Sequence, residues 1–179
     1  MSEVFFTRDI ACGRDRIRGL LLDHEFLTQF VKLQHPVEYD ISVNVSESTS
    51  TMSWVVSTEG TPGIVRRFVG ETIPIRMVIT SPGVAPDQDG SVNLDLEGKI
   101  KGRLQASLSV QSIDQHLAHT TMAVCAHTAM AVGGTFNINA GLLSAKMSDM
   151  ARGHLIVPLL VDLGDLLQEW CDRCGCDHS

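Results

Sequence analysis

The stretch that decides the fold is residues 140–170, which read AGLLSAKMSDMARGHLIVPLLVDLGDLLQEW. Apolar residues recur in it with a helical period, so the sequence predicts one long C-terminal helical segment. A continuous helix of that length would span roughly 45 Å, which exceeds the width of a small domain. The segment also contains Gly153 and Pro158, which both disfavour a regular helix.

The apolar face of this segment changes sides along its length. A helical projection places one stripe in the first half, formed by Leu143, Met147, Met150 and Ala151. The second half has a nearly opposite stripe, formed by Leu155, Ile156, Leu159, Leu163, Leu166 and Trp170. We therefore expect a kink or break between Gly153 and Pro158, with one arm roofing a cavity and the other packing on a sheet or a partner.

Alternating strands precede this segment. Residues 37–45 carry apolar side chains at odd positions, which is the period of a half-buried antiparallel strand. Similar alternation predicts further strands over residues 49–57, 73–79, 92–96, 104–110 and 117–130, with Gly133 and Gly134 ending the last one. The short spacers between them predict an antiparallel meander.

Shorter elements complete the N-terminal half. We expect a strand over residues 2–7, helices over 9–22 and 24–33 with Asp9 and Asp23 as N-caps, and a one-turn helix over 64–69. The predicted fold class is α+β, with a curved antiparallel sheet wrapped around a long C-terminal helix. Residues 1–170 are expected to form one domain, followed by a Cys-rich tail at 171–179.

This order of elements resembles the START-like, or helix-grip, superfamily, which includes pollen-allergen-type lipid carriers, polyketide cyclases and START lipid-transfer domains. The sequence RFVG at residues 67–70 and the stretch 138–170 resemble a bacterial branch of unknown function most. The resemblance implies an apolar cavity between the sheet and the C-terminal helix. It implies no catalytic residue, because the superfamily shares none.

Composition excludes several classes of function. The net charge of −7 argues against nucleic acid and against an anionic membrane surface as partners. The longest apolar run is seven residues, 155–161, so we expect no membrane span. The N-terminus lacks the pattern of a signal peptide, and we therefore expect a soluble, cytoplasmic protein whose five cysteines are reduced.

The candidate ligand-binding residues lie on the predicted apolar stripes. These residues are Tyr39, Trp54, Met77, Met147, Met150 and His154. Tyr and Trp can give a ligand polar contacts, whereas Met fills irregular apolar space. Regularly spaced apolar residues equally describe an ordinary core, and His154 equally describes a buried or an exposed histidine without a role.

Possible metal ligands occur in two places. His119, Cys125 and His127 share one face of the predicted last strand, but side chains four residues apart on a strand are about 13 Å apart. The tail places Cys171, Cys174, Cys176 and His178 in eight residues, which could bind a soft metal, form a disulfide or have no role. We predict no metal site and no cofactor.

The leading hypothesis is that the protein binds or carries a small hydrophobic ligand, lipid-like or aromatic, between the sheet and the helix. The first alternative is a cyclase or dehydratase that uses His154 or Tyr39 as acid or base. The second is an interaction module that forms a homodimer through an apolar stripe of the last helix. No phosphate loop, nucleophile elbow or HExxH pair favours another enzyme class.

Overall fold

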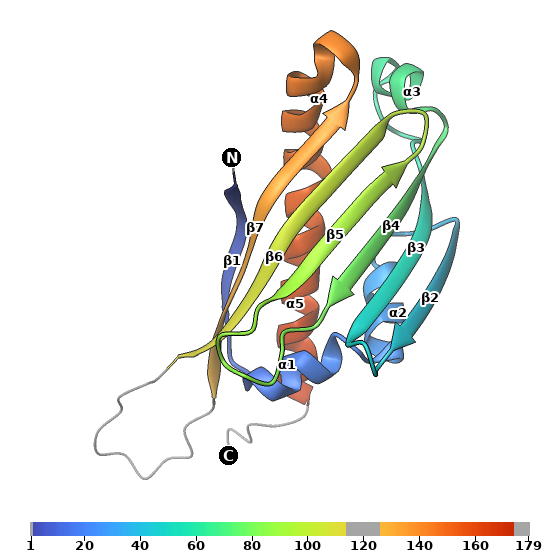
Figure 1. Ribbon diagram of the computed structural model, residues 1–179. Helices are drawn as coiled ribbons and strands as arrows, with labels where there is room; N and C mark the ends of the chain where they lie inside the picture. Colours follow the sequence, from blue (N-terminus) through green and yellow to red (C-terminus); the bar gives the residue numbers. More distant parts are fainter. Residues whose placement is uncertain (1, 114–125, 174–179) are drawn as a thin grey trace.

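The computed structural model describes residues 2–113 and 126–173, and these form a curved sheet crossed on one face by a long helix (Figure 1). The elements follow in the order β1 (Glu3–Ile10), α1 (Arg14–Leu20), α2 (His24–Lys32), β2 (Glu38–Asn44), β3 (Thr49–Ser57), α3 (Gly63–Val69), β4 (Thr72–Thr80), β5 (Gly90–Glu97), β6 (Lys101–Ile113), β7 (His127–Asn139), η1 (Gly141–Leu143), α4 (Ser144–Ala151), η2 (Arg152–Ile156) and α5 (Val157–Arg173). The predicted α+β fold class is confirmed.

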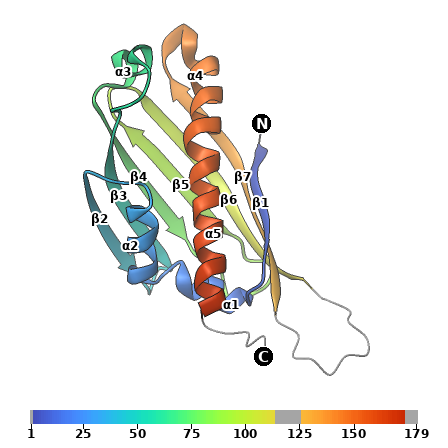
Figure 2. The same ribbon diagram turned by 180° about the vertical axis from the view of Figure 1, so that it is seen from behind.

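Seven antiparallel strands form the sheet in the order β1-β7-β6-β5-β4-β3-β2. The sheet is the predicted meander from β2 to β7, and β1 adds to β7 at the far edge. Apolar side chains alternate with polar ones along each central strand, so one face is buried under the helices and the other faces solvent. Figure 2 shows the helices on the buried face.

Two predictions about the boundaries of elements were wrong. Asp9 caps no helix, because β1 continues to Ile10 and α1 begins only at Arg14. Gly133 and Gly134 do not end the last strand but lie inside β7. A Cβ at Gly134 would lie 2.0 Å from the Gln105 carbonyl oxygen, so glycine lets β6 approach β7 closely. The predicted strand over 117–130 lies partly outside the described residues.

Other local predictions are confirmed. Asp23 caps α2, since its Oδ1 accepts a hydrogen bond of 2.9 Å from the backbone N–H of Phe26. The short helix expected at residues 64–69 is α3.

The C-terminal segment stays helical from Ser144 to Arg173 but widens into a π turn, η2, between α4 and α5. This turn lies between Ala151 and Val157, where we expected the kink, and Pro158 follows it in the first turn of α5. A π turn adds one residue to a helical turn, so it rotates the following face by about 100°. The irregularity therefore moves the apolar face without breaking the helix.

The two arms bury different residues from those expected. The predicted second stripe is confirmed, because Leu159, Leu163 and Leu166 are buried against the sheet. The predicted first stripe is wrong at Leu143 and Met150, which are both exposed. The other two members of that stripe, Met147 and Ala151, are partly buried against the core. Ser148 is the buried residue of α4, and its Oγ accepts a hydrogen bond of 2.8 Å from the N–H of Ile138.

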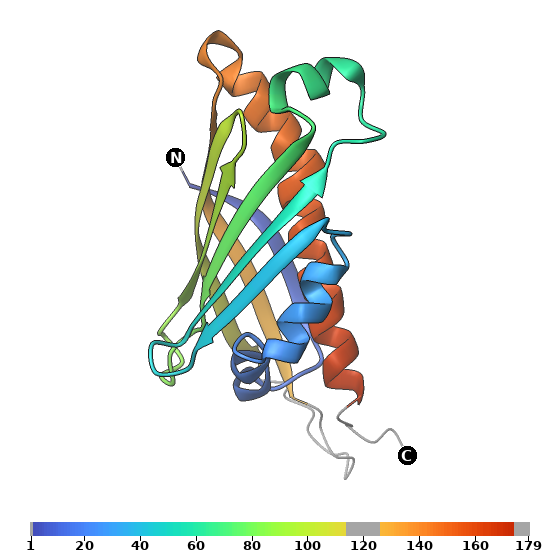
Figure 3. The same ribbon diagram turned by 90° about the vertical axis from the view of Figure 1, so that its right-hand side faces the viewer.

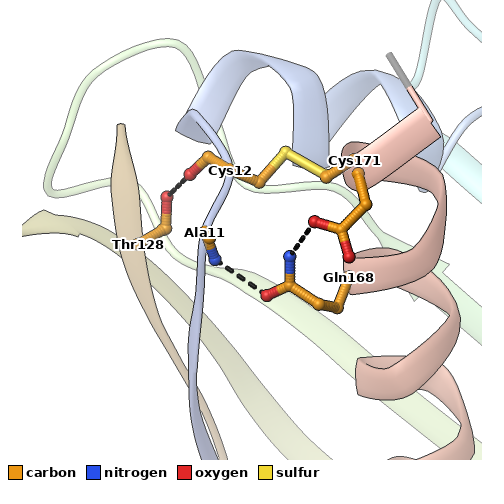
Figure 4. Close-up of a disulfide and its surroundings, with 6 residues drawn as sticks. Ala11, Cys12, Thr128, Gln168 and Cys171 are labelled. Atoms are coloured by element: carbon orange, nitrogen blue, oxygen red, sulfur yellow. Dashed lines mark hydrogen bonds between the residues drawn. A yellow bond between two sulfur atoms is a disulfide. The ribbon is translucent and has the colours of Figure 1, made fainter. Parts of the chain in front are cut away.

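A disulfide joins Cys12, which follows β1, to Cys171 near the end of α5 (Figure 4). The expectation that all cysteines are reduced is therefore wrong for this pair, whose Cα atoms lie 5.7 Å apart in a buried environment. The cytoplasmic location stays a prediction. α5 continues past residue 171 to Arg173, and the division into one domain and a tail stays a prediction.

The end of the molecule that holds this disulfide is tightly closed, and we call it the closed end: α1, the 81–89 loop and the end of α5. Arg14 of α1 is buried, and its guanidinium donates hydrogen bonds to the carbonyl oxygens of Val110 and Gly83, at 2.8 and 2.7 Å. Next to the disulfide, the N–H of Ala11 donates to Gln168 Oε1 at 2.9 Å (Figure 4). The disulfide and this hydrogen bond thus join the segment after β1 to the end of α5.

Candidate functional site

The apolar side chains of β5, β6 and β7 on the inner face of the sheet are all buried, whereas the helical segment that covers them is more exposed at α4 than at α5. Met77, Leu94 and Val132 have no exposed surface. One register step or more toward α4, Leu96 and Ile138 are 6% and 5% exposed. The helix arms differ, since Leu163 has no exposed surface whereas Met147 and Leu155 are only half-buried. The interior is therefore covered less completely by the helical segment beneath α4 than beneath α5.

One cross-strand row of the inner face lies at this level, and we call it the accessible row. Its members are in register on β2 to β7: Tyr39, Trp54, Ile75, Leu96, Gly102 and Ile138. Gly102 contributes no side chain, and Leu96 and Ile138 crowd the place where its Cβ would lie, at 3.0 and 3.2 Å. Ser148 of α4 is hydrogen-bonded to the end of the row at Ile138.

Trp54 is the polar feature of the accessible row. Its indole is 2% exposed and meets the ring of Phe30 edge-on, with ring centroids 6.4 Å apart. Its Nε1 is buried, and no described residue accepts a hydrogen bond from it. The second tryptophan of the chain, Trp170, donates its Nε1–H to Gln29 Oε1 at 2.9 Å. A buried donor without a partner costs about 1–3 kcal/mol, so Trp54 marks a place where an acceptor would stabilise the protein.

Two recesses border this row. The larger has a volume of about 730 Å³ and is lined at the ends of β5, β6 and β7 and by Ser144 of α4. The smaller has a volume of about 280 Å³, and Tyr39, Trp54 and Ile75 are part of its lining. Apart from Ser144, neither lining contains a residue of α4 or α5. Neither recess is therefore the chamber expected between the sheet and the C-terminal helix.

The lining of the larger recess is rich in charge, and its charges balance. Arg103 Nε lies 2.8 Å from Asp95 Oδ1, and Asn137 is the register partner of Arg103 on β7. Glu97 and Lys101 are register partners one step further toward the end of the hairpin. Alternation within each strand predicts only a solvated surface for both carboxylates. Their alignment with the cations follows from strand pairing, which that alternation does not specify.

The structure separates the six predicted ligand-binding residues. Tyr39 and Trp54 are register neighbours and line the smaller recess. Met77 is fully buried in the core, and Met147 is half-buried on α4. Met150 is exposed, and so is His154, which lies in the π turn. The placement of His154 gives no support to its use as an acid or base toward a ligand held by the sheet.

The candidate metal ligands are only partly covered. Within residues 2–113 and 126–173, no group of three His, Cys, Asp or Glu side chains could hold a metal ion. His119, Cys125, Cys174, Cys176 and His178 lie outside the described residues. Cys171 is engaged in the disulfide. No helix of the described part of the chain is long and apolar enough to cross a bilayer.

Among solved structures, the chain is similar to TTHA0849 from Thermus thermophilus, with 10% sequence identity, a TM-score of 0.55, and coverage of 98% of this chain and 99% of that chain. It also aligns with Ara h 8.0201, with 8% identity, a TM-score of 0.45, and coverage of 97% and 99%. No family model and no curated protein matches the sequence. The predicted helix-grip fold is confirmed, and membership of the bacterial branch stays a prediction.

Proposed function

We propose that the protein binds a small, mostly apolar molecule that carries one hydrogen-bond acceptor, such as a fatty acid or an aromatic polyketide. The observation that carries the proposal is the buried, unpartnered Nε1–H of Trp54 on a row that is apolar apart from Trp54 and the exposed Tyr39. In a ligand site, apolar surface supplies affinity and a few polar groups fix orientation. Trp54 offers such a polar group.

The surroundings of Trp54 support the same proposal. Ile75 and Leu96 follow Trp54 along the row and are nearly buried, and the half-buried Met147 and Leu155 lie on the helical segment that crosses this face. Met147 can adjust its unbranched side chain to an irregular ligand. A ligand that displaced or separated these side chains would bring its acceptor to the indole. Ligand carriage and ligand sequestration both require that the ligand enters between these side chains.

Native mass spectrometry tests the proposal directly. Delipidated protein would be incubated with fatty acids and with polyketide-like aromatics, and the retained mass would identify the bound class. We expect one molecule per chain. Failure to retain any member of either class would contradict the proposal.

The Trp54→Phe variant tests the role of the indole N–H. The ring stays apolar while the donor is lost, so a ligand with a carbonyl or hydroxyl group should bind roughly tenfold to hundredfold more weakly. A hydrocarbon of the same shape should bind equally well to both proteins. The matched control is Trp170→Phe, because Trp170 already donates to Gln29 and should not contribute to ligand affinity.

The control variant also provides the readout. In Trp170→Phe the single remaining tryptophan is Trp54, so a change in its fluorescence on addition of ligand reports binding at the accessible row. Unfolding of both variants is measured as well. The smaller phenylalanine in Trp54→Phe leaves a cavity at this buried position, so the free energy of unfolding should fall, and affinities are to be compared only under conditions where both variants are folded. Equal affinity of both variants for the polar ligand would reject the role of Trp54.

A further inference from the structure

The end of the molecule opposite the disulfide carries exposed apolar side chains on two separate elements. Ile64 and Phe68 belong to α3, and Leu142 and Leu143 belong to η1. Ile64 is 71% exposed, and Leu142 is fully exposed. The three views place α3 and the start of α4 at the same end (Figures 1, 2 and 3). We call this end, residues 62–70, 98–101 and 141–147, the tip.

Positive charge is concentrated in the same three segments. They contain the cations Arg66, Arg67, Lys99, Lys101 and Lys146, and no Asp or Glu. Three of the four lysines of the chain are among them, although the whole chain has a net charge of −7. The acidic excess therefore lies elsewhere. Glu71 and Glu97 border the tip in sequence without belonging to it.

These cations are available for a partner. In the described part of the chain, none of the five forms a salt bridge with a carboxylate. Lys99 Nζ donates to the carbonyl oxygen of Arg67 at 3.3 Å, which links the β5–β6 turn to α3. Lys101 Nζ also lies near a carbonyl oxygen, that of Glu97, at 3.4 Å. The tip thus combines cations that lack carboxylate partners with apolar side chains in water.

We propose that the tip docks onto the surface of an anionic lipid membrane. Ile64, Phe68 and Leu142 would enter the boundary between headgroups and acyl chains, and the surrounding cations would contact lipid phosphates. The overall negative charge does not prevent this, because charges are screened beyond about 8 Å at physiological ionic strength. The expectation drawn from the net charge of −7 thus overlooked its uneven distribution.

Docking in this orientation does not depend on the proposed ligand. The larger recess reaches the tip, since Lys101 and Ser144 belong to both. A docked molecule would therefore hold that recess next to the lipid. This contact requires no change of conformation in the described residues.

Vesicle co-sedimentation of the full chain tests the proposal. The probes are vesicles of phosphatidylcholine alone and vesicles with about a third phosphatidylserine, at low and at physiological ionic strength. We expect binding to the anionic vesicles that weakens with salt, and little binding to the neutral ones. Absence of binding to anionic vesicles at low ionic strength would overturn the proposal.

Variants separate the two contributions. Arg66→Gln with Arg67→Gln should weaken binding to anionic vesicles roughly twentyfold, since each cation contributes about fivefold near such a surface. Lys32→Gln on α2 is the matched control and should have little effect, because Lys32 lies outside the tip. Ile64→Ser with Leu142→Ser should abolish the binding that persists at higher salt. Their control is Val45→Ser with Val84→Ser, two exposed valines outside the tip.

Each result decides for or against the tip. If the tip variants and their controls lost vesicle binding equally, the protein would not dock through the tip. Analytical ultracentrifugation without lipid covers the other occupant of an apolar surface, a second copy of the chain. A dimer that dissociates in the Ile64→Ser and Leu142→Ser variant, without vesicle binding, would assign the tip to self-association and overturn membrane docking.

Discussion

The α4 and α5 arms belong to one helical segment, yet they are attached to the sheet in different ways. The α5 arm buries leucines and is joined to β1 by the ion pair between Arg8 and Asp165 and to the β1–α1 junction by the disulfide (Figure 4). In the α4 arm Ser148 is the only buried residue, and the arm packs against β7. Stability is therefore concentrated in α5, whereas α4 can respond to a ligand or a surface.

The largest expected effect comes from removal of the disulfide. Cys12 and Cys171 are 159 residues apart in sequence, and a cross-link that closes so long a loop is expected to contribute about 4–5 kcal/mol to the free energy of unfolding. The Cys12→Ala, Cys171→Ala double variant should have a free energy of unfolding lower by this amount. Urea denaturation monitored by circular dichroism measures it. The wild type under reducing conditions should behave like the variant. An unchanged midpoint would show that the bond does not restrict the unfolded chain.

Truncation of one apolar side chain in each arm compares their packing. Leu163→Ala in α5 removes a fully buried side chain and should lower the free energy of unfolding by about 2–5 kcal/mol. Met147→Ala in α4 removes a half-buried one and should cost about 1 kcal/mol. The same denaturation experiment measures both. Equal losses would contradict the proposed division between the arms.

Two glycines offer the finest comparison. A Cβ at Gly164 of α5 would lie 2.7 Å from Phe6 Cζ, so Gly164→Ala should cost about 1–3 kcal/mol through overpacking. A Cβ at Gly153, in the π turn, would meet no atom within 4 Å. Gly153→Ala should therefore raise the free energy of unfolding by up to about 1 kcal/mol, because alanine favours the helix. Thermal melting should show a lower midpoint for Gly164→Ala and a higher one for Gly153→Ala. A lower midpoint for both variants would contradict the proposed difference between the two positions.

Periodicity predicted the elements well and the faces of α4 poorly. The leucine spacing of α5 follows from burial of one helix face. The alternation at residues 37–45 predicted a strand correctly, although only Ile41 and Val43 of its apolar side chains are half-buried. Leu143 belongs to the 3-10 turn η1 that precedes α4, so a regular α-helical projection does not apply to it. Met150 lies before the π turn, and its exposure depends on which face of α4 meets β7, which periodicity in so short a helix does not fix.

The site and the disulfide depend on long-range register, which a single sequence does not provide. Tyr39 and Trp54 are predictable as apolar residues on neighbouring strands, but the accessible row needs the alignment of six strands. The pairing of Cys12 with Cys171 was missed, because nothing local in the sequence connects them. The exposed leucine at position 142 was equally missed, since a helical projection does not show where a helix begins.

The disulfide also changes what a protease can release. Cys12 and Cys171 enclose nearly the whole domain, so a single cut of the backbone at any position between them leaves two pieces that stay covalently joined. A nicked molecule would run as one band on a gel without reductant and as two bands with it. In that sense the chain between Cys12 and Cys171 behaves as a covalent ring.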